Sequence, residues 1–324
     1  MTHFYEESDI RPLARRVSSS VEYKNGFLMF GGFGINGNIE PNNVTNEIWM
    51  FDQEYGWSFI ESAGPAVRYP SVVKLDNSVY IFGGCGVEKN SLNFSNDVYL
   101  YSNKGFIKLT RDNVKYSPDA RYASAIAHTN KGFVIYGGCG YDNRKIYKYY
   151  SDLWVFDKYT SNWECINDGT EGPGKRYGFG WTSFRDKLYI FGGFDGCREH
   201  NDLWSLDLNV FEWTILNGGN ILPDARYCPA LGYVDNVLIM TGGRSKTNSK
   251  LNYHDTWVYN GIWHRLSTDN SPGYHAKSAY CSDGKKMWLF GGEGKHGHVS
   301  DLWKFSKGIW SCIQSPSNDD PLMW

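Results

Sequence analysis

Six copies of a unit of about 52 residues predict an all-β protein, a β-propeller of six blades with four antiparallel strands each. The first observation is a Gly-Gly pair that recurs six times, each time after a short apolar run rich in β-branched and aromatic residues. The first glycines of these pairs are Gly31, Gly83, Gly137, Gly192, Gly242 and Gly291. The second observation is that three other sequence features recur with the same period as the glycine pairs. A period of this length with four short strands per copy is typical of propeller blades.

The landmarks occur in the same order in every copy. Upstream of the glycines, an arginine or a histidine follows a proline by three residues, and we call this place the arginine position. It is held by Arg15, Arg68, Arg121, Arg176, Arg226 and His275. Its separation from the first glycine is the same in five copies and shorter by one position after Arg68. Downstream come a triplet that begins with an acidic and ends with an aromatic residue, as in Asp152-Leu153-Trp154, and a closing aromatic residue such as Trp163.

These landmarks predict where the four strands of each unit lie. We expect strand one after the arginine position, strand two in the apolar run that ends in Gly-Gly, strand three at the triplet and strand four around the closing aromatic residue. Glycine pairs at the end of a strand let neighbouring backbone or rings approach closely. The acidic residues of the triplets are expected to bond backbone or a neighbouring side chain and not to act as an acid–base pair.

Composition excludes several classes of protein. The chain has 324 residues, of which 17% are aromatic and 21% charged, and its formal net charge is −2. That is too apolar for a disordered chain and gives no electrostatic reason to expect nucleic acid. No stretch approaches the roughly 18 apolar residues of a membrane helix. The start of the chain carries Glu6, Glu7 and Asp9 and lacks the apolar block of a secretory signal. We therefore expect neither a nucleic-acid nor a membrane partner.

The seven cysteines are an odd number, and none forms a CxxC pair. Neither a zinc ribbon nor a thioredoxin-type redox site is suggested. Without a secretory signal, the simplest interpretation is reduced thiols in a cytoplasmic protein. We expect no cofactor and no metal.

The ordered set of arginine position, Gly-Gly, triplet and closing aromatic residue resembles the kelch repeat, and the resemblance covers nearly the whole chain. It implies one six-bladed kelch propeller over residues 12–314, followed by a C-terminal tail at 315–324. Residues 1–11 form an N-terminal arm or an extra edge strand, since Phe4 stands eight residues before Pro12 as Trp57 stands eight before Pro65. Because each copy holds its own four strands, closing the ring requires no exchanged strand.

The resemblance also implies that the loop entering strand one and the loop after Gly-Gly lie towards the same side of the propeller. The arginine position would then recur around one rim, with a tyrosine beside it in four copies. Guanidinium groups bind carboxylates through two hydrogen bonds, and tyrosines add amphipathic contact area. We expect the ligand-binding residues to be Arg15, Arg68, Arg121, Arg176, Arg226, His275, Tyr69, Tyr122, Tyr177 and Tyr227. The alternative is that the arginines, which belong to the common kelch pattern, hold the blades together.

Specificity is expected in the loops after Gly-Gly, where the copies differ. Copies one to three have the longest loops, which contain Asn38, Glu40, Lys89, Asp142, Arg144 and Lys145. The fifth loop is basic because of Arg244, Lys246 and Lys250. Arginines at the rim and a basic loop favour an anionic ligand despite the near-neutral net charge.

Histidines and a glutamate in these loops raise an enzymatic alternative. The candidates for acid–base or metal-binding groups are Glu293, His296, His298 and His200. Plant specifier proteins are kelch proteins with an iron site in a Glu-x3-Asp-x3-His pattern. Here Gly297 stands four residues after Glu293, and Leu203 four after Glu199, so that pattern is absent.

The expected function is therefore a ligand-binding propeller, a protein–protein interaction module that recognises a carboxylate-bearing peptide or ligand on its arginine- and tyrosine-lined face. Its partner would be a protein, a peptide or a small anion. The alternative is a kelch-fold enzyme of the lyase, isomerase or cyclase type with its active site in the same face. Fold alone does not decide between them, because propellers host both uses.

Overall fold

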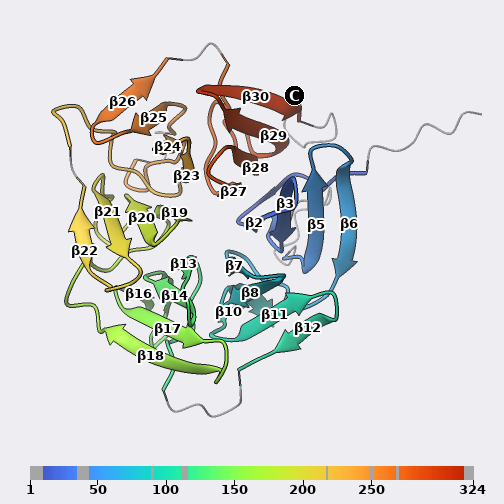
Figure 1. The fold of residues 1–324 in the computed structure, drawn as a ribbon, viewed down its shortest axis with the longest axis vertical. Coiled ribbons are helices and arrows are strands. Elements are labelled where there is room, and N and C mark those ends of the chain that lie inside the picture. Colours follow the sequence, from blue (N-terminus) through green and yellow to red (C-terminus); the bar gives the residue numbers. More distant parts are fainter. Residues whose placement is uncertain are drawn as a thin grey trace, which may run out of the picture.

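The computed structural model describes residues 10–34, 44–88, 91–110, 116–216, 218–248, 252–267 and 270–316. In this part of the chain, six four-stranded antiparallel sheets stand around a central axis as the blades of a propeller (Figure 1). This confirms the predicted fold class. None of the described segments forms a helix long and apolar enough to cross a membrane.

The first three blades are built as follows. Blade 1 contains β2 (Ser19–Tyr23), β3 (Gly26–Phe30), β5 (Glu47–Asp52) and β6 (Gly56–Ser62). Blade 2 contains β7 (Ser71–Leu75), β8 (Ser78–Phe82), β11 (Val98–Ser102) and β12 (Gly105–Lys108). Blade 3 contains β13 (Ala125–His128), β14 (Gly132–Tyr136), β17 (Leu153–Asp157) and β18 (Asn162–Asn167).

In the last three blades, the described residues form no strand beyond the four of each sheet. Blade 4 contains β19 (Gly180–Phe184), β20 (Lys187–Phe191), β21 (Leu203–Asp207) and β22 (Trp213–Ile215). Blade 5 contains β23 (Ala230–Val234), β24 (Val237–Thr241), β25 (Thr256–Tyr259) and β26 (Trp263–Leu266). Blade 6 contains β27 (Ala279–Ser282), β28 (Met287–Glu293), β29 (His298–Ser306) and β30 (Ile309–Gln314).

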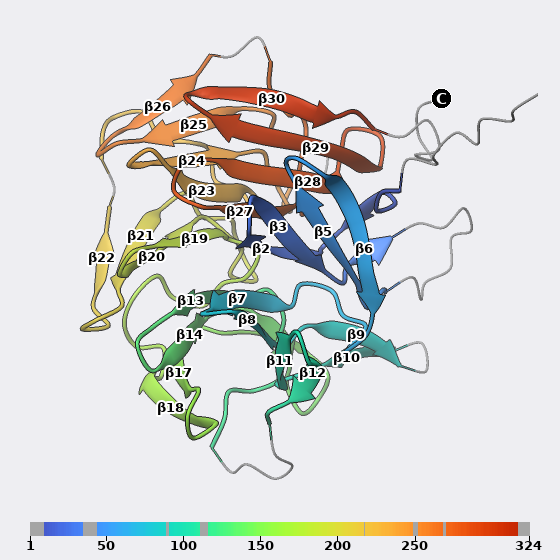
Figure 2. The ribbon, with the colours of Figure 1, turned by 45° about the vertical axis from the view of Figure 1, so that its right-hand side comes forward.

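Three short pairs of strands lie outside the blades, in the first three copies. The two-residue strands β1 (Arg15–Arg16) and β4 (Phe33–Gly34) pair in the first copy. The loops of blades 2 and 3 form hairpins, β9 (Cys85–Glu88) with β10 (Ser91–Phe94) and β15 (Cys139–Tyr141) with β16 (Tyr147–Tyr149). In Figure 2 the hairpin of β9 and β10 projects beyond the four-stranded sheet of its blade.

The ring closes by packing between the first and the last blade, which lie side by side (Figure 1). Each sheet takes its four strands from one copy of the repeat, so no strand is exchanged. The Trp57 ring of blade 1 packs against Phe290 of blade 6 with 4.9 Å between centroids. The Trp57 Nε1–H also donates a hydrogen bond to Gln314 Oε1 at 2.7 Å. The extra strand considered at Phe4 falls outside the described residues.

The hydrophobic core lies between neighbouring sheets, and the closing aromatic residues fill it. Trp163 of blade 3 packs edge-on against Phe82 of blade 2 at 5.2 Å. It contacts Phe133 and Phe156 of its own blade at 5.6 and 5.1 Å. One closing aromatic residue per copy therefore joins each blade to its neighbour.

The glycine pairs bring the end of strand two close to the loop that enters the next blade. Gly83 has a φ of +67°, and a Cβ atom there would lie 2.5 Å from the carbonyl oxygen of Arg121. The N–H of Gly84 donates to that same oxygen at 2.9 Å. Only glycine fits such an approach in this conformation. The pair therefore places the arginine position of blade 3 against blade 2.

Candidate ligand-binding site

Five of the six residues at the arginine position are buried inside the blades and paired with acidic residues of the triplets. Arg121 binds Asp152 through two hydrogen bonds of 2.5 and 2.9 Å, and Trp154 Nε1 donates to the same carboxylate at 2.7 Å. The other pairs are Arg15 with Glu47, Arg176 with Asp202, Arg226 with Asp255 and His275 with Asp301. Although burial opposes ionisation, the hydrogen bonds and charge of Arg121 hold the pKa of Asp152 below its ordinary value.

This arrangement differs from the expected rim of ligand-binding arginines. Arg121 and Arg226 are 0% exposed. A buried guanidinium without a carboxylate partner would be strongly destabilising, so the chain supplies that partner itself. The five residues that are therefore bound to the chain's own carboxylates are Arg15, Arg121, Arg176, Arg226 and His275.

Blade 2 is the exception, because Val67 and not Arg68 holds the structural place of the buried arginine. The carbonyl oxygen of Val67 accepts a hydrogen bond from Gly32 N–H at 3.0 Å, as that of Arg121 does from Gly84. The separation between Arg68 and Gly83, one position shorter than in the other copies, is the sequence signal of this shift. Without an arginine, Asp97 pairs with Lys108 at 3.0 Å.

As a result, Arg68 is aligned with the tyrosines that follow the arginine position in blades 3 to 5. The backbone of Arg68 forms an isolated β-bridge with Cys85, the residue after Gly-Gly. Tyr122 forms the same bridge with Cys139, and Tyr177 with Phe194. We call this set the rim ring, and its members are Arg16, Arg68, Tyr122, Tyr177, Tyr227 and Ala276. Arg16 was not among the expected site residues, although its place directly after the arginine position could have identified it.

The next residue in each copy has a left-handed backbone conformation, with φ between 47° and 62°. These residues are Val17, Tyr69, Ala123, Gly178, Cys228 and Lys277. Their backbones are linked around the axis, since Val17 N–H donates to Lys277 O at 2.8 Å and Tyr69 N–H donates to Val17 O at 2.7 Å. This conformation costs free energy for residues other than glycine, and such residues are often found at functional sites. Here the conformation turns the side chains of Tyr69, Cys228 and Lys277 into the axial pocket.

The axial pocket has a volume of about 240 Å³ and lies at the mouth of the central channel. Its walls come from the rim ring, from the left-handed residues and from the loops after Gly-Gly. The residues that line it are Arg16, Val17, Arg68, Tyr69, Cys85, Leu92, Tyr122, Tyr147, Tyr177, Tyr227, Cys228, Lys246 and Lys277. Among these described residues are four cationic side chains and no acidic one. The pocket is therefore suited to an anion.

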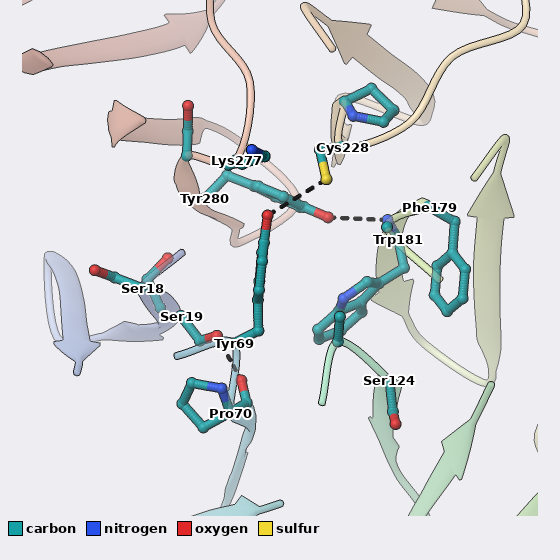
Figure 3. Close-up of a pocket in the computed structure, with 15 residues that line it drawn as sticks. Ser18, Ser19, Tyr69, Pro70, Ser124, Phe179, Trp181, Cys228, Lys277 and Tyr280 are labelled. Atoms are coloured by element: carbon teal, nitrogen blue, oxygen red, sulfur yellow. Dashed lines mark hydrogen bonds between the residues drawn. The ribbon is translucent and has the colours of Figure 1, made fainter. Parts of the chain in front are cut away.

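A smaller cavity of about 60 Å³ adjoins this pocket (Figure 3). Tyr69, Cys228 and Lys277 line both spaces. Figure 3 shows the Tyr69 hydroxyl directed at the Cys228 sulfur, 3.3 Å away. It also shows the Tyr280 hydroxyl accepting a hydrogen bond of 3.0 Å from the backbone N–H of Trp181. The Tyr69–Cys228 contact therefore lies between the axial pocket and the small cavity, and the Tyr280–Trp181 contact belongs to the small cavity alone.

Three cations beside the pocket share one carboxylate. Glu293, the residue after Gly-Gly in blade 6, accepts hydrogen bonds from Arg16, from Arg244 at 2.7 Å and from Lys277 at 2.8 Å. Burial and the neighbouring cations lower the pKa of Lys277 to about 8, although Cys228 acts in the opposite direction. Glu293 therefore neutralises only part of the positive charge gathered here.

The other two cations of the pocket, Arg68 and Lys246, have no acidic partner among the described residues. Lys246 donates to the Tyr177 hydroxyl at 2.6 Å and lies 5.0 Å from the centre of that ring. Arg68 lies 3.7 Å from the Cys85 sulfur. Glu199 of blade 4 anchors the loop that carries Lys246, because its carboxylate accepts hydrogen bonds from Ser245 and from the backbone of this loop.

Two of the four catalytic candidates are cross-strand neighbours, and the other two lie elsewhere. Glu293 binds the three cations, and His298 lies opposite it in the β28–β29 ladder. Burial and the charges of Arg16 and Lys277 lower the pKa of His298 to about 4. His200 is 2.9 Å from Asp195, and His296 is exposed on its loop.

Nothing in the described segments groups three or more metal-binding side chains in a way that could hold an ion. The loop residues Asn38, Glu40, Lys89 and Lys250 lie outside the described part of the chain. Arg144 and Lys145 lie in the described third-blade loop and are exposed, and Arg144 pairs there with Asp142.

The repeat architecture and the buried arginine–carboxylate pairs define a kelch-type propeller. A family model described as the KLHDC2/KLHL20/DRC7 Kelch-repeats domain matches residues 70–272. The chain therefore belongs to the kelch-repeat family, whose propellers generally serve as protein-interaction modules.

Curated relatives are distant and mostly larger. The chain is 26% identical over 313 residues to the leucine-zipper-like transcriptional regulator 1 homolog of Drosophila melanogaster, a match of 90% of this chain and 31% of that protein. It is 25% identical over 191 residues to human Kelch domain-containing protein 3, with 56% of this chain and 48% of that protein covered. The chain spans about a third or less of the length of the first relatives it matches.

Among solved structures, the one described as "Structure of YjhT" superposes with a TM-score of 0.74. The match covers 94% of this chain and 98% of the other, at 17% sequence identity. At that identity the likeness supports the fold alone.

Proposed function

We propose that the chain is a protein-interaction module that binds a carboxylate-bearing peptide in the axial pocket. The observation that carries this proposal is the pair of cations, Arg68 and Lys246, that line a tyrosine-walled pocket without an acidic partner among the described residues. Cations gathered along one cavity attract an anion, and a guanidinium binds a carboxylate through two parallel hydrogen bonds. Of the expected ligand-binding residues, the proposal keeps Arg68, Tyr69, Tyr122, Tyr177 and Tyr227.

The proposal replaces the five buried residues of the arginine position with Arg16, Lys246 and Lys277. Arg15, Arg121, Arg176, Arg226 and His275 are not kept, because each is bound to its own triplet carboxylate. We do not propose an enzyme, because none of the four catalytic candidates lines the axial pocket.

The size of the pocket favours a peptide over a whole small molecule. Small-molecule sites are usually about 300 to 1,000 Å³, whereas this pocket is about 240 Å³. It would hold one or two side chains of a longer segment that continues across the propeller face. All seven cysteines are described and unpaired, which is the state expected in a reducing compartment, and we propose a cytoplasmic location on that ground.

The test is selection from a random nonapeptide phage library on the purified full chain. We expect enrichment of Asp and Glu for the wild type and loss of that enrichment in an Arg68→Met/Lys246→Met variant. A charge-matched control, Arg265→Met/Lys104→Met, removes two exposed cations on outer strands and turns and should behave as the wild type. Selection without acidic enrichment, or equal enrichment in the pocket variant, would contradict the proposal. If millimolar glutarate binds through Arg68 and Lys246 but no peptide is selected, the ligand is a small anion.

A further inference from the structure

The two halves of the axial pocket differ in their chemistry. In a closed ring of six blades, blades 2 and 3 stand opposite blades 5 and 6 (Figure 1). Leu92, Tyr122 and Tyr147 come from blades 2 and 3, whereas Lys246 and Lys277 come from blades 5 and 6. Arg68 also comes from blade 2, so the half that we call apolar carries one cation and the half that we call cationic carries two, and a ligand that fills the pocket meets both halves.

The apolar half is built by the two hairpins that only blades 2 and 3 carry among the described residues. The hairpins pack together through Phe94 and Tyr141, whose ring centroids are 4.7 Å apart. Phe94 also contacts the rim residue Tyr122 at 5.4 Å, and Tyr141 contacts Tyr147 at 4.9 Å. Tyr147 nevertheless remains 47% exposed. A rigid, supported and exposed ring beside a pocket is a favourable place for an apolar side chain to bind.

In the cationic half, Glu293 determines which charges are available to a ligand. Lys277, with Arg16 and Arg244, already shares its carboxylate. Lys246 is held instead by aromatic rings, 5.0 Å from the centre of Tyr177 and 4.9 Å from that of Phe194. An incoming carboxylate therefore meets least competition at Lys246 and at Arg68, the two cations of the pocket without an acidic partner among the described residues.

The apolar and cationic halves are close enough for one short peptide segment to contact both. The ring centroids of Tyr122 and Tyr177 are 5.9 Å apart, and Lys246 lies 5.0 Å from the second of them. An extended peptide advances about 3.3 Å per residue. A segment can therefore contact both halves with side chains that are one to three residues apart.

We propose that the peptide bound by this pocket carries an aromatic or long aliphatic side chain within three residues of its acidic group. The apolar side chain lies on Tyr122, Leu92 and Tyr147, and the acidic group binds Lys246 or Arg68. This inference rests on the proposed function, because it requires that the axial pocket binds an acidic peptide.

The experiment compares the sequences that the phage library yields with the wild type and with two variants. The hairpin variant Leu92→Ala/Tyr147→Ala removes the apolar half and leaves the cations in place. A matched control, Tyr55→Ala/Ile309→Ala, removes an exposed tyrosine and an exposed aliphatic residue from outer turns and edges, where they are 77% and 59% exposed. Thermal unfolding of all variants identifies any that fail to fold, and a single Tyr147→Phe variant, which keeps the ring, should retain the selection.

We expect wild-type peptides to pair Asp or Glu with an aromatic or long aliphatic residue within three positions. The hairpin variant should lose that pairing, keep the acidic enrichment and bind the best wild-type peptide about tenfold more weakly. Acidic peptides with random neighbours, or unchanged pairing in the hairpin variant, would overturn this inference and leave the proposed function standing. Peptides without acidic enrichment would overturn both.

Discussion

Val67 holds in the second blade the place that Arg121 holds in the third. Each carbonyl oxygen accepts a hydrogen bond from the second glycine of the preceding blade, at 3.0 Å for Val67 and 2.9 Å for Arg121. Because the second copy is one residue shorter here, Arg68 falls at the next position and faces the axial pocket. A difference of one residue in the spacing before Gly-Gly thus determines whether the arginine is buried in the blade or available to a ligand.

Substitution of the two arginines should separate stability from binding. Arg121→Met leaves the Asp152 carboxylate without its partner, and we expect a loss of about 3 kcal/mol or more in the free energy of unfolding. Arg68→Met should cost less than about 1 kcal/mol, because Arg68 has no acidic partner among the described residues. Urea unfolding of both variants measures this difference. Equal losses would mean that Arg68 also supports the fold.

Binding of an acidic peptide should weaken as the pH rises from 7 to 9. Lys277 has a pKa lowered to about 8 by burial and by neighbouring cations such as Arg16. It is charged below that pH and loses its proton as the pH rises through it, so the pocket becomes less positive. Burial raises the pKa of Tyr227 to about 12, so this tyrosine does not titrate in the same range. Fluorescence polarisation with a selected peptide measures the effect.

The control for this pH dependence is Lys277→Arg, which keeps the positive charge over the whole range because arginine stays protonated. Its affinity should vary less between pH 7 and 9 than that of the wild type. A wild-type affinity that is constant over this range would contradict a role for Lys277 in anion binding.

Removal of the shared carboxylate should make the protein depend on added anions. In Glu293→Gln, Arg16, Arg244 and Lys277 lose their common partner and repel one another, so we expect a lower melting temperature. Sodium sulfate should restore part of the loss, because a ligand that binds only the folded state stabilises it. Differential scanning fluorimetry at matched ionic strength, with NaCl as the reference salt, measures this.

The matched control for the sulfate experiment is Glu164→Gln, which removes an exposed carboxylate on β18. Its melting temperature should respond to sulfate as that of the wild type does. A sulfate response of Glu293→Gln no larger than this would show that the three cations do not form an anion site.

His298 should make the fold sensitive to mild acid. Its pKa is lowered from 6.5 to about 4 by burial and by the charges of Arg16 and Lys277, so the folded state holds it neutral. Between these values the unfolded chain binds a proton that the folded chain does not, and stability therefore falls as the pH drops from 6.5 towards 4. His298→Gln should lose less stability than the wild type over this range in urea titrations at pH 7, 6 and 5. Parallel losses would assign the acid sensitivity to other groups.

Much of the fold can be predicted from the amino-acid sequence. The six glycine pairs, the triplets such as Asp152-Leu153-Trp154 and the closing aromatic residues such as Trp163 predict the number of blades and the order of their strands. This works because a blade is a local unit whose strands follow one another in the chain, so that each repeat carries the pattern of its own sheet.

The residues of the candidate site can be predicted from the sequence only in part. Four tyrosines were expected beside a rim, and in the structure all four line one pocket. They are Tyr69, Tyr122, Tyr177 and Tyr227. The arginine position was expected to face the same rim, yet in copies 1, 3, 4 and 5 its side chain turns into the blade and pairs with a triplet carboxylate.

The order of residues alone specifies the repeat, the blade count and the kinds of side chain that gather at one end of the propeller. Which of these side chains are free follows from the folded chain, because pairing depends on contacts between residues far apart in the sequence. Arg68 and Arg121 each stand three residues after a proline, and in the sequence only the separation from Gly-Gly distinguishes them. The backbone register that places Val67 in the buried position separates them, and that register is set by hydrogen bonds between neighbouring blades.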